Sequence, residues 1–442
     1  MSGSMKGRLI GVVGIAAGLL AAGTTDSRAP KRLMKPAFVP PVDAPKFAPD
    51  RVVVKFTETK SAQEIEALFG TLGGHFLESG VDHAFEVLRV APGTVESWVA
   101  TLSKLPGVVY AEPDYICWMS GAPNDTYYNP YQWNFFNWGQ LSNGYASNYG
   151  VQGDSAWNTN RGASVIVAVV DTGVAYENYG SYVLGPDLSG ATFVSPNDYV
   201  NVDSHANDDN GHGTHVCGTI RQQTNNNLGL AGLAYECQIM PVKVLDSAGS
   251  GYHSWIADGI RWAANNGAFS INLSLGGSTG SSTLSSAVDY AWNQGCVLCA
   301  ATGNGGKGNL DYPARYANCM AVGATRFDGK RCTYSNYGSG IDVVAPGGDT
   351  TVDQNHDGYG DGILQETFSG GYGNFGYYFF EGTSMATPHA TATAALVKSN
   401  KSWFTNTDVR NAIQTKTKDL GTSGYDTKFG YGLVSAKDAL TY

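Results

Sequence analysis

The chain has 442 residues, of which 15% are charged, and its composition is that of an ordinary globular protein with roughly two or three domains. The formal net charge of −10 lies wholly in residues 120–442, because residues 1–119 hold 12 basic and 12 acidic side chains and the remainder hold 16 and 26. An acidic body of low charge density argues against nucleic acid as a partner, and either bound cations or plain solubility explains its sign.

Residues 1–23 have the pattern of a secretion signal. Lys6 and Arg8 precede an apolar run over residues 9–22, which is too short to span a bilayer and ends in small residues that suit a signal peptidase. An uncleaved membrane anchor is the alternative, and no later segment is apolar enough to cross a membrane. We therefore expect a secreted protein that is not attached to a membrane after maturation.

Residues 24–49 predict a proline-rich linker, since six of the 17 prolines of the chain lie between positions 29 and 49. The alternation of strands and helices that follows predicts a small α+β unit. Its strands are expected at residues 51–56, 85–90 and 108–110, and its helices at residues 61–69 and 95–105.

From Val151 onward, short apolar runs alternate with amphipathic helices, which is the pattern of a parallel sheet covered on both faces. The runs span residues 165–170, 239–245, 269–275, 296–301 and 320–324, and the helices are expected at 254–265, 281–294, 384–399 and 407–415. Ligands of such sheets bind at the carboxyl ends of the strands, so the residues that follow each run are the first candidates for a site.

Asp171 directly follows the first run, where a rigidly held carboxylate could orient an imidazole; an Asp that caps a turn is the alternative. His212 stands between two glycines, which leave its ring accessible. His215 lies three residues further along, but no glutamate completes a helical zinc motif. We therefore expect His215 to be a buried structural histidine rather than a zinc ligand.

Asn304 ends another apolar run, and its side-chain amide could donate to a developing oxyanion, although a turn Asn is the alternative. Ser384 opens an alanine-rich helix. Proline is tolerated only near a helix start, so Pro388 places this serine at the helix N-terminus, where free N–H groups favour negative charge. A purely capping role is the alternative for Ser384.

In that order along the chain, Asp171, His212, Asn304 and Ser384 resemble the catalytic set of the subtilisin-like serine proteases. The resemblance extends from about Asn124 to the C-terminus. It implies an α/β fold of three layers around a parallel sheet, and a monomeric serine endopeptidase that works through an acyl-enzyme. His212, oriented by Asp171, would take the proton of Ser384, and Asn304 would bind the oxyanion. The alternative is a catalytically inactive calcium-binding or adhesive protein on the same scaffold, against which the intact set of four argues.

The resemblance also predicts where an extended peptide substrate would bind. Two edge segments would pair with its main chain, namely Gly249, Ser250 and Gly251 on one side and Ser274, Leu275, Gly276 and Gly277 on the other. Thr302 and Gly303 would wall the first side-chain pocket. Asp311 falls near the floor of that pocket, where a carboxylate would favour Lys or Arg before the scissile bond; a solvated loop Asp is the alternative.

Residues 108–115 resemble the end of a subtilase propeptide, which is a small α+β fold of the ferredoxin-like type. The resemblance implies an inhibitory propeptide at residues 50–119 and a catalytic domain at residues 120–442, with self-cleavage near residues 118–122. The expected partners are therefore a protein or peptide substrate and the protein's own propeptide as inhibitor.

Residues 353–361 carry oxygen-bearing residues at alternate positions and a glycine at the sixth, which predicts a calcium loop of the EF-hand type. The expected ligands are Asp353, Asn355, Asp357, Tyr359 and Asp361. Leu364 occupies the twelfth position of the loop, where the motif requires an acid, so the sequence departs from the motif there. A solvated acidic loop is the alternative. Resemblance to thermitase-like members implies two more Ca²⁺ sites, one at Asp125, Asp187, Asn226, Leu228 and Leu230, and a weaker one at Asp198, Asp203 and Asn207.

Seven cysteines form an odd set for an exported protein, but Cys117 precedes the expected cleavage point and six remain. Six cysteines in an oxidising compartment either pair or stay as buried free thiols. Cys296 and Cys299 are too far apart on one strand to bond each other, so Cys296–Cys319 is the leading pairing, although the sequence leaves the connectivity open.

Overall fold

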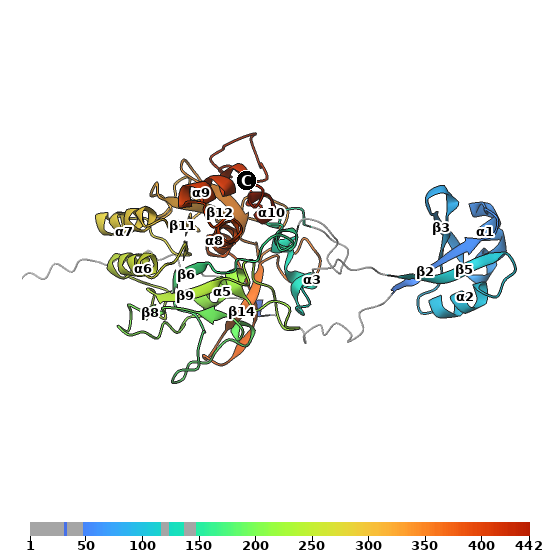
Figure 1. Cartoon of the computed structure of the whole chain (residues 1–442), viewed down its shortest axis with the longest axis horizontal. Coiled ribbons are helices and arrows are strands. Elements are labelled where there is room, and N and C mark those ends of the chain that lie inside the picture. Colours follow the sequence, from blue (N-terminus) through green and yellow to red (C-terminus); the bar gives the residue numbers. More distant parts are fainter. Residues whose placement is uncertain (1–30, 33–46, 116–122, 137–146) are drawn as a thin grey trace, which may run out of the picture. The chain divides into compact units, whose positions relative to one another are not determined.

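The computed structural model describes residues 31–32, 47–115, 123–136 and 147–442, which fall into two compact units (Figure 1). One unit is Lys35–Thr126, and the other is Tyr127–Tyr442 together with Met1–Met34. The expected secretion signal at residues 1–23 and the expected cleavage segment at residues 118–122 lie outside the described residues. Within the described ranges, no helix has the length and apolar character to cross a bilayer.

The smaller unit is an antiparallel four-stranded sheet packed against two helices. Its strands follow the order β3-β4-β2-β5 in the sheet, and the chain order of strands and helices is that of the ferredoxin-like fold. The elements are β2 (Phe47–Phe56), α1 (Ala62–Phe69), β3 (His75–Ser79), β4 (Glu86–Arg89), α2 (Val95–Leu102) and β5 (Val108–Tyr115). The edge strand β3 was not predicted, because it is partly exposed and its sequence mixes polar and apolar residues.

The larger unit is built on a parallel sheet, as predicted. The strand order is β13-β12-β11-β10-β6-β9-β7, with the short β8 also paired to β9, and the paired strands run parallel. The strands are β6 (Ile166–Asp171), β7 (Thr192–Phe193), β8 (Asn197–Asp198), β9 (Gln238–Lys243), β10 (Ser270–Leu273), β11 (Val297–Ala301), β12 (Cys319–Thr325) and β13 (Val343–Pro346). Asp171 at the end of β6 lies directly opposite Lys243 at the end of β9.

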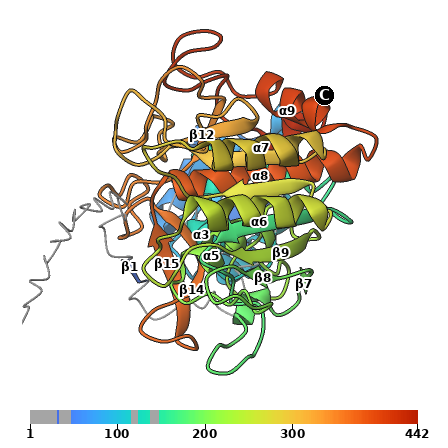
Figure 2. The same cartoon turned by 90° about the vertical axis from the view of Figure 1, so that its left-hand side faces the viewer.

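Helices cover both faces of this sheet, which gives three layers (Figures 1 and 2). On one face, α6 and α7 pack through Ile260 and Val288 against buried strand residues such as Val170 and Met240. On the other face, α5 and α8 pack against each other and against the strands. The main helices are α5 (His212–Arg221), α6 (His253–Asn265), α7 (Ser282–Asn293), α8 (Thr383–Asn400) and α9 (Asn406–Thr415), and the short ones are α3 (Tyr128–Tyr131), α4 (Gly153–Ala156) and α10 (Ala436–Ala439). The predicted α/β fold of three layers around a parallel sheet is therefore confirmed.

An antiparallel hairpin precedes α8 and was not predicted from the sequence. It consists of β14 (Ile363–Phe368) and β15 (Phe375–Phe380), and β1 (Lys31–Arg32) adds to β15. β14 packs against α5, so the hairpin connects the helix that begins at His212 with the segment that leads to Ser384.

The six described cysteines are buried free thiols, so the leading pairing, Cys296–Cys319, is wrong. The register of the sheet explains this, because Cys319 lies opposite Leu298 and is therefore displaced by two residues, roughly 7 Å along the strand, from Cys296. The Cys296 thiol instead donates to the carbonyl oxygen of Ala268 at 3.0 Å. Cys117 lies outside the described residues.

Candidate active site

Asp171 and His212 meet at the carboxyl end of the parallel sheet. Nδ1 of His212 lies 2.7 Å from Oδ1 of Asp171. The Asp171 side chain is fully buried, whereas 25% of the His212 side chain is exposed. Because a carboxylate can only accept, Nδ1 carries the proton, and Nε2 is left as the basic nitrogen of the neutral ring.

A second carboxylate, Asp208, braces the loop that leads to His212. Its Oδ1 accepts hydrogen bonds from Thr172 Oγ1 at 2.8 Å and from the Gly211 N–H at 2.9 Å. Its Oδ2 accepts from the N–H and the hydroxyl of Thr214 at 2.9 and 2.6 Å. These bonds tie the start of α5 to the residue that follows Asp171. Sequence reasoning missed this role, although the two aspartates before His212 were a visible signal.

Ser384 lies in the first turn of α8, as Pro388 indicated. Its hydroxyl donates to the carbonyl oxygen of Ser274 at 3.2 Å, and the Ser274 hydroxyl donates to the carbonyl oxygen of Ser384 at 2.7 Å. The reciprocal bonds join the nucleophile candidate to the end of β10. The expected substrate edge at Ser274 is therefore adjacent to Ser384.

Asn304 is held by Thr383, the residue before Ser384. Its Oδ1 accepts from the Thr383 N–H at 2.9 Å and from the Thr383 hydroxyl at 2.8 Å. Since the amide oxygen takes both bonds, the Nδ2 donor is turned toward Gly382, where an added Cβ would lie 3.4 Å from it. Sequence reasoning did not single out Thr383, which orients the amide that it did identify.

Two other histidines near these residues are structural. Nε2 of His215 lies 3.1 and 3.0 Å from the carbonyl oxygens of Ile363 and Tyr378, and burial lowers its pKa to about 3. His389 is also fully buried, with its pKa lowered to about 4 by burial. Both rings therefore stay neutral, and the rejection of a zinc pair at His212 and His215 agrees with the carbonyl partners of His215.

The first predicted substrate edge is an exposed turn. The Ser250 N–H donates to Asp246 Oδ1 at 2.9 Å, and the Ser250 carbonyl accepts from the Asp246 N–H at 2.8 Å. Gly251 has to be a glycine, because a Cβ would lie 2.2 Å from the carbonyl oxygen of Val244. Gly249 lies at the bend of this turn with φ of 74°.

The second edge lies beside the predicted pocket floor. Gly277 pairs with Tyr312 through two backbone bonds of 2.9 and 2.8 Å. A Cβ added to Gly276 would lie 3.4 Å from Cβ of Asp311. Leu275 is buried next to these residues. The structure therefore brings the edge and the candidate pocket residue together.

Asp311 reaches the predicted pocket wall. A Cβ added to Gly303, whose φ is 100°, would lie 2.1 Å from Asp311 Oδ2, so the carboxylate occupies the space next to this glycine. Burial raises the pKa of Asp311, while Lys307 and a hydrogen bond from Asn336 act in the opposite direction. Thr302 is buried and accepts the Asp311 N–H on its carbonyl oxygen at 3.0 Å.

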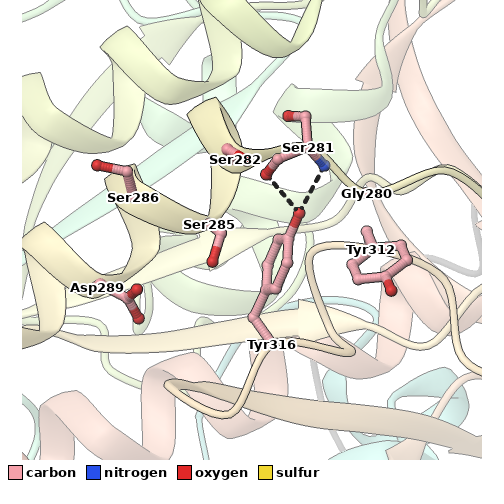
Figure 3. Close-up of a pocket in the computed structure, with 8 residues that line it drawn as sticks. All are labelled: Gly280, Ser281, Ser282, Ser285, Ser286, Asp289, Tyr312 and Tyr316. Carbon is pink, nitrogen blue, oxygen red and sulfur yellow. Dashed lines mark hydrogen bonds between the residues drawn. The ribbon is translucent and has the colours of Figure 1, made fainter.

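A surface pocket of about 570 Å³ lies beside this edge, between α7 and the residues that follow Asp311 (Figure 3). The Tyr316 hydroxyl closes one side, because it accepts from the Ser281 N–H and donates to the Ser281 carbonyl, both at 2.9 Å. Serine hydroxyls and Asp289 from α7, the ring of Tyr312 and Gly280 complete the lining. This pocket was not predicted from the sequence.

The loop at residues 353–361 is organised largely by its own carboxylates. Asp353 accepts the N–H groups of Asp357 and Gly358, each at 3.1 Å, and Asp357 Oδ1 accepts the N–H of Tyr359 at 2.7 Å. Asp361 differs, because it is buried and its Oδ1 has no hydrogen-bond partner in the described structure. Burial raises the pKa of Asp361 to about 7, and Asp357 and Asp353 add to the shift.

Residues of this loop fit a hard cation, because they offer carboxylate and amide oxygens around a buried, unpartnered carboxylate oxygen. Asn355 completes the set, with its side-chain oxygen 3.1 Å from the Asp357 N–H that donates to it. Among the described residues, no three His, Cys, Asp or Glu side chains lie together in a way that could hold a metal ion. The loop therefore presents candidate ligands rather than a closed cage.

The residues of the first thermitase-like site lie around Asp187. This carboxylate is fully buried and accepts Asn226 Nδ2 at 2.7 Å, Gln222 Nε2 at 2.6 Å and the Leu230 N–H at 3.0 Å. Burial is the main cause that raises its pKa to about 8, and the neighbouring Glu366 adds to the shift. Two adjacent buried carboxylates fit a cation that neutralises them.

The remaining calcium candidates lie in several short segments. Leu228 is exposed and its N–H donates to the Asn226 side chain at 2.9 Å, and Asp125 is buried. Asp198 and Asp203 lie side by side through backbone bonds of 3.0 and 3.1 Å. Asn207 donates from its side-chain nitrogen to Glu177 at 2.9 Å, and its side-chain oxygen is buried without a hydrogen-bond partner among the described residues, so it remains a candidate ligand.

Comparison with known proteins gives matches in both units. Residues 162–432 match the Subtilase family and residues 35–114 match the fervidolysin N-terminal prodomain. A thermophilic serine proteinase from Bacillus sp. (strain AK1) is 38% identical over 403 residues, which are 90% of this chain and 88% of that protein. Thermitase from Thermoactinomyces vulgaris is 39% identical over 292 residues, covering 66% of this chain and 94% of thermitase. Among solved structures, a protease from Pseudoalteromonas arctica superposes with a TM-score of 0.62 at 31% identity, covering 72% of this chain and 99% of that one.

Proposed function

Because this chain belongs to the subtilase family and is a serine endopeptidase of that family, we propose that Ser384 is its nucleophile, His212 its general base and Asp171 the carboxylate that orients the base. The observation that carries the proposal is the 2.7 Å contact between Asp171 and Nδ1 of His212, which leaves Nε2 unprotonated. A serine hydroxyl needs such a base to become nucleophilic.

The reaction follows from these roles. Nε2 of His212 takes the proton of Ser384 as Oγ attacks the scissile carbonyl carbon, and the carbonyl oxygen becomes an oxyanion. The imidazolium then gives that proton to the leaving amine, which departs and leaves an acyl-enzyme ester on Ser384. Water, deprotonated by His212, attacks the ester, and the released serine recovers the proton. Asp171 stays ionised and stabilises the imidazolium throughout.

We propose that Asn304 Nδ2 and the Ser384 backbone N–H bind the oxyanion. Support comes from Thr383, whose two hydrogen bonds fix the amide oxygen of Asn304 and leave the N–H₂ group as the free donor. The Ser384 N–H lies in the first turn of α8, where N–H groups lack helical acceptors. Preorganised donors of this kind stabilise the transition state more than the substrate.

We propose that substrates bind as an added strand between the segments at residues 249–251 and 274–277, and that Asp311 selects Lys or Arg before the scissile bond. The approach of Asp311 to Gly303 and Gly276 supports this selectivity. A scan of peptides varied at that one residue tests it. Preference for Lys and Arg is expected, and equal cleavage of peptides with Leu or Phe at that residue would contradict it.

We propose that the protein is exported as a precursor and cleaves itself near residues 118–122, releasing the unit at residues 50–119 as an inhibitor. The prodomain match and the ferredoxin-like fold of that unit support the proposal. A Ser384→Ala precursor is expected to stay uncleaved, whereas the wild-type precursor should process. Cleavage of the Ser384→Ala precursor in the absence of any other protease would contradict self-processing.

We propose that Ca²⁺ stabilises the larger unit. Asp353, Asn355, Asp357 and Asp361 would hold one ion, and Asp187 with Asn226 would hold a second. Bound calcium would supply positive charge to the buried carboxylates Asp361 and Asp187. Terbium luminescence sensitised by Tyr359 tests the first site directly. Luminescence that is competed by calcium and lost in Asp361→Asn is expected, and equal luminescence in that variant would contradict the assignment.

A further inference from the structure

A buried lysine, Lys243, lies beside the catalytic residues at the end of β9. Its Nζ is within 2.8 Å of the carbonyl oxygen of Thr172, 2.7 Å of Asp209 Oδ1 and 2.6 Å of the carbonyl oxygen of Leu245. The lysine side chain is fully buried, and Asp209 is only 14% exposed. All three donor positions of the ammonium group are therefore used.

Each of these three acceptors belongs to a different part of the active site. Thr172 follows Asp171 at the end of β6, Asp209 lies three residues before His212, and Leu245 leads into the turn at residues 249–251 that is expected to bind substrate. One ammonium group thus joins the segments that carry the orienting carboxylate, the base and the first substrate edge.

A second contact links two of the same segments. The Asn210 side chain donates to the carbonyl oxygen of Ser247 at 3.0 Å, and its own oxygen accepts the N–H of His212 at 3.2 Å. The loop before His212 is thereby attached, through Asp209 and the next residue Asn210, to the segment that leads into the substrate edge.

Stability alone is a poor reason for this arrangement. Desolvation of two charges commonly offsets their attraction, so a buried ion pair contributes little compared with apolar side chains of similar volume. Burying this pair costs desolvation free energy, and the pair contacts three parts of one site. Its presence is therefore better explained by the geometry that it fixes.

We propose that Lys243 and Asp209 are a positioning pair, which sets the distance between the substrate edge at residues 249–251 and the Asp171–His212 couple. The inference rests on the proposed catalytic roles. An extended peptide held by that edge depends on the pair for the placement of its scissile carbonyl against Ser384. A one-residue ester does not reach the edge and depends on it much less.

The chain offers a closely matched control. Arg410 on α9 also binds two carbonyl oxygens, those of Ala317 and Cys319, and one carboxylate, Asp342, at 2.7, 3.1 and 2.8 Å. This pair lies at the start of β12, the amino end of the sheet, whereas Lys243 lies at the carboxyl end. Both pairs therefore join a cationic side chain to two carbonyl oxygens and one aspartate, and they lie at opposite ends of the strands.

The test compares Lys243→Met/Asp209→Asn with Arg410→Met/Asp342→Asn, since each double variant leaves no unpaired charge. We expect the first to lose about 100-fold in kcat/KM for a five-residue peptide and less than about 10-fold for a one-residue ester, because a displacement of about 1 Å can cost that much. The second double variant should have a lower thermal unfolding temperature, but its kcat/KM for the peptide and for the ester should both stay within about 2-fold of the wild-type values. The single variant Lys243→Arg keeps the positive charge and should therefore retain part of the peptide activity that the Lys243 double variant loses.

Equal losses with peptide and ester, or equal losses in the two double variants, would overturn the proposal. If the Lys243 double variant does not fold, Asp209→Asn keeps both carbonyl contacts of Lys243, and the same peptide-to-ester difference decides the question. Failure of the underlying catalytic assignment is distinguishable, because the wild-type enzyme would then not react with a small fluorophosphonate at Ser384.

Discussion

Two regions of the larger unit contain buried carboxylates in very different states. At the catalytic end of the sheet, protein donors hold the carboxylates, since Oδ1 of Asp171 contacts His212 and Asp208 accepts bonds from Thr172, Gly211 and Thr214, although Oδ2 of Asp171 has no partner among the described residues. In the loop at residues 353–361, Asp361 is buried with one oxygen unpartnered and its pKa raised to about 7.

This difference indicates that the geometry of the first region comes from the protein itself, whereas we propose that the second region depends on a bound cation. The proposed catalytic residues are positioned by strand ends and a helix start. In the loop, Asp353 and Asp357 add to the raised pKa of Asp361, whose buried Oδ1 has no partner among the described residues, and this is the expected state of a cation site without its cation. Substitutions should therefore affect activity in the first region and stability in the second.

The largest expected effect is a loss of catalytic rate when residues at the carboxyl end of the sheet are changed. His212→Ala should lower kcat by about 10⁶-fold, because the base is lost, while Asp171→Asn should cost about 10⁴-fold, because the amide favours the wrong tautomer. Both variants should unfold within a few degrees of the wild type. Steady-state kinetics on a peptide amide, with circular dichroism as the folding control, measure the two effects.

A smaller loss is expected at the oxyanion site. Asn304→Leu should lower kcat by about 100- to 1,000-fold with little change in KM, since its amide donates only when the oxyanion forms. Thr383→Val should cost less, because it removes only one of the two hydrogen bonds that hold the Asn304 amide. A larger change in KM than in kcat for Asn304→Leu would place this residue in substrate binding instead.

Much of the fold and site could be predicted because the signals are local. Continuous apolar runs predicted the parallel strands, and Asp171 and Asn304, which lie at or just after the ends of two of them, are the candidate site residues that this pattern identified. Non-local features were missed. The β14–β15 hairpin and the strand β3 depend on pairing partners, and the supports Thr383, Asp208 and Lys243 act through contacts that a linear sequence does not reveal. The Cys296–Cys319 bridge failed for the same reason, since its geometry depends on strand register.

Calcium removal tests the loop at residues 353–361, and it should change the unfolding temperature more than the catalytic rate. Saturating calcium should raise the unfolding temperature by about 5–10 °C over the value in chelator, which corresponds to binding at about 100 times Kd. Asp361→Asn should abolish most of the gain from this site. Asp426→Asn is a matched control, because Asp426 also accepts N–H groups of its own loop, those of Thr422 and Phe429.

The calcium effect should also depend on pH in a defined direction. The pKa of Asp361 in the folded protein is about 7, above the value of about 3.9 for an unfolded Asp, so without calcium the folded state holds a proton that the unfolded state has lost. Stability in chelator should therefore fall as pH rises from about 4 to 7. Calcium binds the ionised carboxylate, so its stabilising effect should be larger at pH 8 than at pH 5, as differential scanning calorimetry would show. A gain from calcium that is independent of pH would argue against Asp361 as a ligand.

The smallest expected effect concerns the pocket. Asp311→Ser should reduce the preference for Lys and Arg over Leu by about 10-fold in kcat/KM, because the variant removes a carboxylate that Lys307 partly offsets. Rates on peptides with Leu before the scissile bond should stay nearly unchanged. If both peptide types slow down equally, Asp311 supports the loop and does not select the substrate.

The most direct measurement of the central assignment is labelling of the mature protein with a fluorophosphonate, followed by peptide mapping by mass spectrometry. The proposed chemistry predicts one adduct on Ser384, and a rate of labelling that falls as the pH is lowered, because an imidazolium cannot accept the serine proton. His212→Ala should not be labelled at a comparable rate. An adduct on another residue, or an active protease that leaves Ser384 unlabelled, would contradict the assignment.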